Sequence, residues 1–201
     1  MRFTALKPIF GRTSPAESFP APIVGKAKAR RTAQLAEAAQ VLDVLPAEGE
    51  TLHALMTGRY DLMHLIAVLI RRLGGCSDVK IATLSFNGKN LAEMLALMDG
   101  GANLTLLASA FFRDHNKELW TETLEDFRER GQRAAAARSH CKVVTLACLD
   151  GRRFSLEGSA NLRTNSNREQ FALTHDEAVH DWHARWIDDL VRQHEGEPAS
   201  N

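Results

Sequence analysis

The segment SHCKVVTLACLDGRRFSLEGSANLRTNSNREQ, residues 139–170, decides the fold predicted for this chain. It opens with His140 and Lys142, directly before an apolar run, and continues through the turn-forming dipeptide Asp150-Gly151. Because side chains in a strand alternate between two faces, His140 and Lys142 are expected to point to the same side. An Asp-Gly dipeptide between two apolar runs predicts a β-hairpin.

The second strand of the predicted hairpin leads into Gly-Ser-Ala-Asn, residues 158–161. Ser159 and Asn161 share a face if this segment is also extended, and the hairpin would place them beside the His-x-Lys pair. One surface then gathers an imidazole, an ammonium, a hydroxyl and a carboxamide. The ammonium and the neutral donors can hold phosphate oxygens, while the imidazole can attack phosphorus or move a proton. This set of groups is suited to a phosphodiester.

The block resembles the active-site motif of the phospholipase D superfamily, which is His-x-Lys, four residues, Asp, six residues and Gly-Ser-x-Asn. The position of the family's Asp holds Ala147 in this chain, and the nearby acid is Asp150 at the predicted turn. Fifteen residues separate Lys142 from Gly158, where the family pattern has eleven. Four extra residues divided evenly between two strands lengthen the hairpin without changing the face that each side chain occupies.

The resemblance covers roughly residues 55–175 and implies one phospholipase D-like repeat of the single-motif, nuclease-like kind. A downstream Asn-x-Glu, formed by Asn167 and Glu169, resembles the one that nuclease-like members carry. Members with one motif generally place two copies face to face, so a homodimer is implied. The implied catalytic residues are His140, Lys142, Ser159, Asn161 and Glu169, and Asn167 is a candidate for substrate binding.

In the scheme that the resemblance implies, His140 of one subunit attacks phosphorus and forms a phosphohistidine. His140 of the other subunit protonates the leaving oxygen and then activates water. Lys142, Ser159 and Asn161 hold the non-bridging oxygens. Glu169 could orient a histidine by accepting its second ring proton. The scheme uses no metal or other cofactor, and the sequence shows no carboxylate cluster of the kind that holds a metal.

Periodicity predicts an α/β order along the rest of the chain. Helices are predicted over residues 26–45, 59–73, 89–98, 116–133 and 176–194, and strands over 79–86, 103–109 and 171–173 in addition to the hairpin. The alternation predicts a mixed, largely parallel sheet flanked by helices. His64, on the second predicted helix, is interpreted as a core or boundary histidine rather than a ligand.

Ligands of such sheets bind beyond the carboxyl ends of the parallel strands. The loops expected there are Asn87-Gly88-Lys89 and Phe111–His115, and both carry polar groups that can line a pocket. Asn87 and Lys89 are therefore predicted to bind substrate.

A length of 201 residues with 44% hydrophobic content predicts one globular domain with an extra segment. We expect an irregular basic arm with an Ala-rich helix over residues 1–45, a phospholipase D-like domain over 46–195 and a flexible tail over 196–201. The chain has no formal net charge, but its first 31 residues carry seven Lys and Arg against one Glu. The arm is interpreted either as a phosphate-contacting element or as a solvated helix end.

Three scattered cysteines fit neither a disulfide framework nor a zinc site, so a cytoplasmic location is expected. No signal peptide or membrane-spanning run is recognised. The first functional hypothesis is a metal-independent nuclease acting on DNA or RNA. The second is a protein of the same fold that binds nucleic acid without efficient cleavage, suggested by Ala147. Lipid hydrolysis fits less well, because lipid-cleaving members carry two motifs in longer chains.

Overall fold

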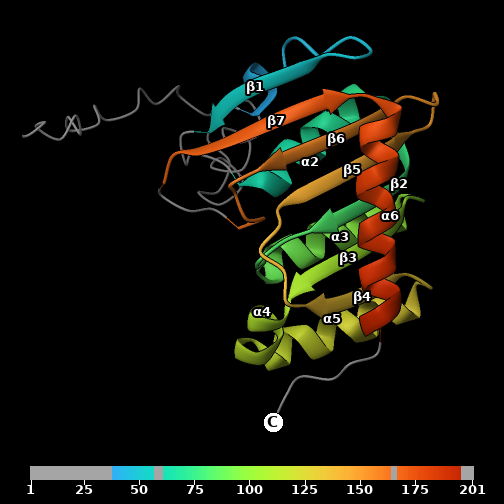
Figure 1. The fold of residues 1–201 in the computed structure, drawn as a ribbon. Coiled ribbons are helices and arrows are strands. Elements are labelled where there is room, and N and C mark those ends of the chain that lie inside the picture. The colour runs from blue at the N-terminus through green and yellow to red at the C-terminus, as the bar shows by residue number, and fades with distance from the viewer. Residues whose placement is uncertain (1–37, 57–60, 164–166, 196–201) are drawn as a thin grey trace, which may run out of the picture. The chain divides into compact units, whose positions relative to one another are not determined.

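The computed structural model describes residues 38–56, 61–163 and 167–195, which form a seven-stranded sheet flanked by helices (Figure 1). The strands are β1 (Thr51–Met56), β2 (Cys76–Ala82), β3 (Asn103–Ser109), β4 (Arg133–Ala137), β5 (Val143–Cys148), β6 (Arg153–Gly158) and β7 (Glu169–His175). The helices are α2 (Leu62–Arg72), α3 (Gly88–Asp99), α4 (Ala110–His115), α5 (Lys117–Glu129) and α6 (Glu177–His194). The predicted α/β class is confirmed.

The sheet is mixed, as predicted, but it is largely antiparallel rather than largely parallel. The strand order is β1-β7-β6-β5-β2-β3-β4, and only the pairs β2–β3 and β3–β4 among the described strands are parallel. The reason is the hairpin: β5 lies antiparallel to β2, and its short turn makes β6 antiparallel to β5. β7 and β1 then add two more antiparallel pairs.

Two short strands were missed by the sequence prediction. β4 has the sequence Arg-Ala-Ala-Ala-Ala, and the high helix propensity of alanine argues against a strand. The strand is nevertheless buried on both faces. Its small side chains let α6 pack closely on one side of the sheet. β1 is an edge strand with weak alternation, paired only with β7 among the described residues. The helix predicted over 116–133 starts correctly but ends at Glu129, before the positive-φ residue Gly131.

Two apolar layers hold the helices on opposite faces of the sheet. On one face, α2, α3 and α5 pack against the main core, which contains Ile66, Val79 and Leu106. On the other face, Ile187 and Val191 of α6 pack against a smaller cluster from β2 to β5. Figure 1 shows α6 lying across the strands on the side opposite to α2 and α3. The elements that carry the predicted site therefore rest on a sheet covered from both sides.

The described part of the 26–45 segment packs on the domain. Residues 38–41 are helical, and both Ala38 and Leu42 are fully buried in the main core. Arg72 of α2 donates hydrogen bonds to the carbonyl oxygens of Leu42 and Ala39, at 2.6 and 3.1 Å. The predicted arm before residue 38 and the tail after residue 195 lie outside the described residues. In the described part of the chain, no helix combines the length and apolar character of a membrane span.

Candidate active site

His140 and Lys142 lie in the short segment that joins β4 to β5. The Lys142 ammonium lies 3.0 Å from His140 Nδ1 and donates to the His140 carbonyl oxygen at 2.7 Å. His140 is exposed, whereas Lys142 is 8% exposed. Burial lowers the pKa of Lys142, although the nearby Cys141 and Glu169 act in the opposite direction. A partly dehydrated ammonium beside an exposed imidazole is well placed to bind an anion.

Ser159 and Glu169 form a second pair across the end of the β6–β7 ladder. The Ser159 hydroxyl donates a short hydrogen bond to Glu169 Oε2 and accepts one from the Gln170 backbone N–H at 3.1 Å. The Ser159 backbone N–H in turn donates to the Gln170 carbonyl at 3.0 Å. Glu169 thus holds the Ser159 hydroxyl, and its role in orienting a histidine stays a prediction.

The predicted hairpin forms, and it brings Lys142 next to Gly158, the residue before Ser159. Val143, the first residue of β5, pairs with Glu157, and the Gly158 backbone N–H donates to the Lys142 carbonyl at 3.1 Å. Glu169 also acts to raise the pKa of Lys142, against the lowering by burial. An imidazole, an ammonium, a hydroxyl and a carboxylate thus belong to residues at the same end of the β5–β6–β7 ladder.

The two predicted asparagines differ in their surroundings. Asn161 is half-buried, and its Oδ1 is shielded from solvent without a hydrogen-bond partner in the described part of the chain. A buried polar atom of this kind is often completed by a ligand or by water. Asn167 is exposed. Substrate contacts by either residue stay predictions.

Ala147, which stands at the family's Asp position, lies far from His140. It pairs with Arg153 near the turn of the hairpin, five strand residues beyond Lys142 and hence roughly 16 Å along the strand. Asp150 lies in the turn itself and accepts from the Arg152 backbone N–H at 3.1 Å and from its Nε at 2.8 Å. An acid at this end of the hairpin can shape the turn but cannot reach the reacting groups. The absence of Asp at 147 therefore removes no group from the candidate site.

Gly158 is required where the two strands meet closely. A Cβ atom on this residue would lie 2.5 Å from the Gln170 carbonyl oxygen, which is a backbone atom that cannot move aside. We expect Gly158→Ala to lower both thermal stability and nucleic-acid cleavage, because relief of the clash must displace Ser159 from Glu169 and Gln170. Melting temperature and initial rate measure the two effects. Gly88→Ala is the matched control, since its Cβ would meet nothing within 4 Å, and equal behaviour of both variants would contradict this role for Gly158.

Asn87 and Lys89, predicted to bind substrate, have structural partners in a separate cluster. Asn87 caps α3 by accepting from the Asn90 backbone N–H at 3.0 Å. The Lys89 ammonium lies 3.3 Å from Nε2 of His64, which is fully buried as predicted for a core histidine. No described contact joins Asn87 or Lys89 to His140 or Ser159, so their binding of substrate stays a prediction.

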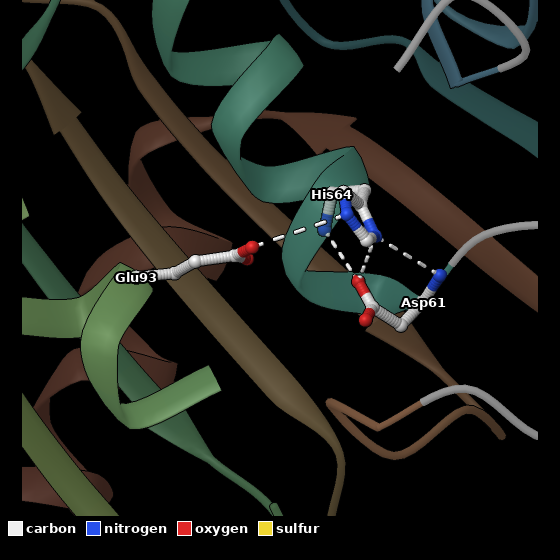
Figure 2. A group of neighbouring side chains, drawn as sticks. All are labelled: Asp61, His64 and Glu93. Carbon is white, nitrogen blue, oxygen red and sulfur yellow. Dashed lines mark hydrogen bonds and ion pairs between the residues drawn. The ribbon is translucent and has the colours of Figure 1, made fainter. Parts of the chain in front are cut away.

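The cluster contains a group that could hold a metal ion. Asp61, His64 and Glu93 are buried and offer ligand atoms within 4.8 Å of one another (Figure 2). Asp61 caps α2 and its carboxylate contacts His64 Nδ1, while His64 Nε2 lies 3.9 Å from Glu93 on α3. The Lys89 ammonium already supplies positive charge at Nε2. We interpret the group as a polar link between α2 and α3, which sequence spacing could not show because Glu93 lies on another helix.

Comparison with known proteins supports the predicted fold. No family model matches the sequence, and no curated protein matches it. Among solved structures, Nuc, a phospholipase D family member from Salmonella typhimurium, has a TM-score of 0.53 at 10% identity, with 75% of this chain and 99% of that chain covered. The chain has the phospholipase D fold. NucT from Helicobacter pylori has a TM-score of 0.51 at 17% identity, with 73% and 98% covered.

The fold of this chain is also similar to that of a DNA-binding protein. TrmBL2, an archaeal chromatin protein that binds DNA, has a TM-score of 0.52 at 11% identity, with 85% of this chain and 62% of that chain covered. At such low identities the likeness is one of fold. Nuc and NucT are covered almost completely, so the whole of each matches within this chain. The chemistry must be argued from the side chains of this chain itself.

Proposed function

We propose that the chain is a metal-independent phosphodiesterase that cleaves nucleic acid through a phosphohistidine in a homodimer. The observation that carries the proposal is the joining of the His140–Lys142 pair to the Ser159–Glu169 pair across one hairpin. The nuclease-like resemblance of the motif and the fold shared with Nuc and NucT support it.

Phosphate binding prepares His140 for attack. In the free chain the Lys142 ammonium faces Nδ1, which places the ring proton of a neutral imidazole on Nε2. A phosphodiester would draw this ammonium to its non-bridging oxygens, so that Nδ1 can carry the ring proton instead. Nε2 then presents a lone pair to phosphorus. Lys142, with Ser159 and Asn161, would stabilise charge that develops on those oxygens.

The proposed reaction has two steps. Nε2 of His140 forms a bond to phosphorus while the bond to the leaving oxygen breaks, and His140 of the partner subunit gives that oxygen a proton. The second histidine, now neutral, takes a proton from water as the water oxygen attacks phosphorus. The P–N bond breaks, and His140 is released with its electron pair. The homodimer supplies the second histidine, because His140-x-Lys142 is the one His-x-Lys in this chain that is followed by Gly-Ser-x-Asn; the other, His115-x-Lys117, is not.

Incubation with labelled single- and double-stranded DNA and RNA in excess chelator tests this function. We expect cleavage to continue in chelator, and we expect acid-labile, alkali-stable phosphate to be trapped on His140. A purified dimer that cuts no nucleic acid at any salt concentration would contradict the proposal.

The alternative, binding without efficient cleavage, was suggested by Ala147. Ala147 lies at the far end of the hairpin, away from the reacting groups, so it gives that alternative no support.

The three cysteines are free thiols, which accords with the proposed cytoplasmic location.

A further inference from the structure

A groove opens directly beside His140, and its other lining residues have no assigned catalytic role. Its volume is about 520 Å³, and it is lined by Leu84, Ala110, Phe111 and Arg138 together with Ser139 and His140. The sequence predicted that the segment containing Phe111 would line a pocket, and the structure places it at the end of β3 as part of α4. Whatever binds in this groove lies next to the proposed nucleophile.

Phe111 is a large aromatic side chain fixed in an exposed position. It is 64% exposed, and its ring stacks on His115 with centroids 4.0 Å apart and an interplanar angle of 28°. His115 Nδ1 also donates to the Phe111 carbonyl oxygen at 2.8 Å, which ties the two residues together. An aromatic ring braced on one side and open to solvent can accept a nucleobase on its surface.

Arg138 adds a positive charge to the same groove. It follows β4 directly and is exposed, and within the part of the chain that the structure describes no carboxylate forms an ion pair with it. It also lines a second groove of about 410 Å³, which shares Ala110 with the first and contains His194. Arg138 therefore lies where a strand leaving His140 would pass from one groove to the next, and its guanidinium can bind a phosphate.

We propose that Phe111 and Arg138 form a subsite for an unpaired nucleotide next to the scissile phosphate. The base stacks on Phe111, and the adjoining phosphate contacts Arg138. This assignment rests on the proposed phosphodiesterase function and names its substrate as single-stranded nucleic acid. A base within a duplex has both faces covered by its neighbours, so it must leave the stack before it can lie on Phe111. The subsite thus favours single strands over duplexes.

Fluorescence anisotropy with labelled single-stranded and duplex oligonucleotides tests the subsite, using the full chain with His140→Ala to prevent cleavage. Adding Phe111→Ala is expected to weaken single-strand binding about tenfold, the effect of one lost base stack. Duplex binding should change less than about twofold. Phe111→Trp should retain the single-strand affinity. Arg138→Gln should weaken both and reduce the salt dependence by the equivalent of about one phosphate contact.

Leu149→Ala provides the matched control, because Leu149 is 68% exposed but lies at the turn of the hairpin. It should leave both affinities unchanged. The subsite is overturned if Phe111→Ala leaves single-strand binding intact, weakens duplex binding equally, or converts a dimer to a monomer in sedimentation. The experiment separates binding from cleavage. If the wild-type protein cut no nucleic acid but Phe111→Ala still weakened single-strand binding, the subsite would stand. Only the proposed reaction would then be refuted.

Discussion

Replacing His140 with alanine is expected to lower the rate of nucleic-acid cleavage by at least about 10³-fold. The proposed reaction uses this side chain twice in the dimer, as nucleophile and as general acid, so both roles are lost together. Groups that act as a unit show such non-additive losses. His140 is exposed and its ring is not part of the core, so the fold should persist. Single-turnover cleavage in excess chelator, with the melting temperature measured in parallel, provides the test.

His175→Ala is the histidine control for that experiment. His175 lies at the opposite end of β7 from Glu169 and contacts the Pro46 carbonyl oxygen at 3.2 Å. It should retain cleavage close to the wild-type rate. Cleavage by His140→Ala within tenfold of wild type, in a preparation free of contaminating nuclease, would exclude the phosphohistidine mechanism.

Local sequence patterns predicted much of the fold and part of the candidate site. The Asp-Gly turn between two apolar runs specifies the hairpin, and that hairpin brings Lys142 next to Gly158. Strand β3 was predicted over its full observed length, because its apolar run has clear ends. These features depend on neighbours in sequence, which is why the sequence could predict them.

Features that depend on tertiary packing were not predicted. β4 is a strand because the sheet and α6 enclose it, which overrides the helix propensity of its alanines. The Ser159–Glu169 hydrogen bond joins residues ten apart in sequence, and no local pattern signals it. Asp61 and Glu93 meet across two helices, and no sequence spacing signals such a contact. The prediction of a largely parallel sheet was wrong because β5, the first strand of the hairpin, runs antiparallel to β2.

Asp61→Ala should destabilise the folded chain by about 2–4 kcal/mol, which combines a lost helix cap with a buried polar partner left unsatisfied. Asp61 is 2% exposed and accepts from the His64 backbone N–H at 2.9 Å. Its carboxylate also contacts the His64 ring, which is fully buried. Without the carboxylate, the first turn of α2 loses its side-chain cap and the His64 ring loses its contact at Nδ1, while Lys89 remains beside Nε2. Urea denaturation measures the loss as a shift in midpoint at constant slope.

Asp99→Ala is the matched surface control for Asp61→Ala. The Asp99 side chain is 61% exposed and pairs with Arg130 at 2.9 Å, so its removal should cost less than about 1 kcal/mol. If the two variants were equally stable, the polar link that Asp61, His64 and Glu93 form between α2 and α3 would not stabilise the fold.

The charge of Asp61 should make this stabilisation depend on pH. Burial alone would raise the pKa of Asp61, but the hydrogen bonds and charge of His64, with a contribution from Lys89, lower it overall. A carboxylate with a lowered folded-state pKa stabilises above its unfolded pKa, near about 3.9, and loses this contribution as pH falls through the folded value. Asp61→Asn keeps a capping side chain but removes the charge. The stability difference between wild type and Asp61→Asn should therefore be largest near neutral pH and shrink below about pH 4. A difference that stays constant from pH 7 to pH 3 would mean that Asp61 acts through its shape and cap alone.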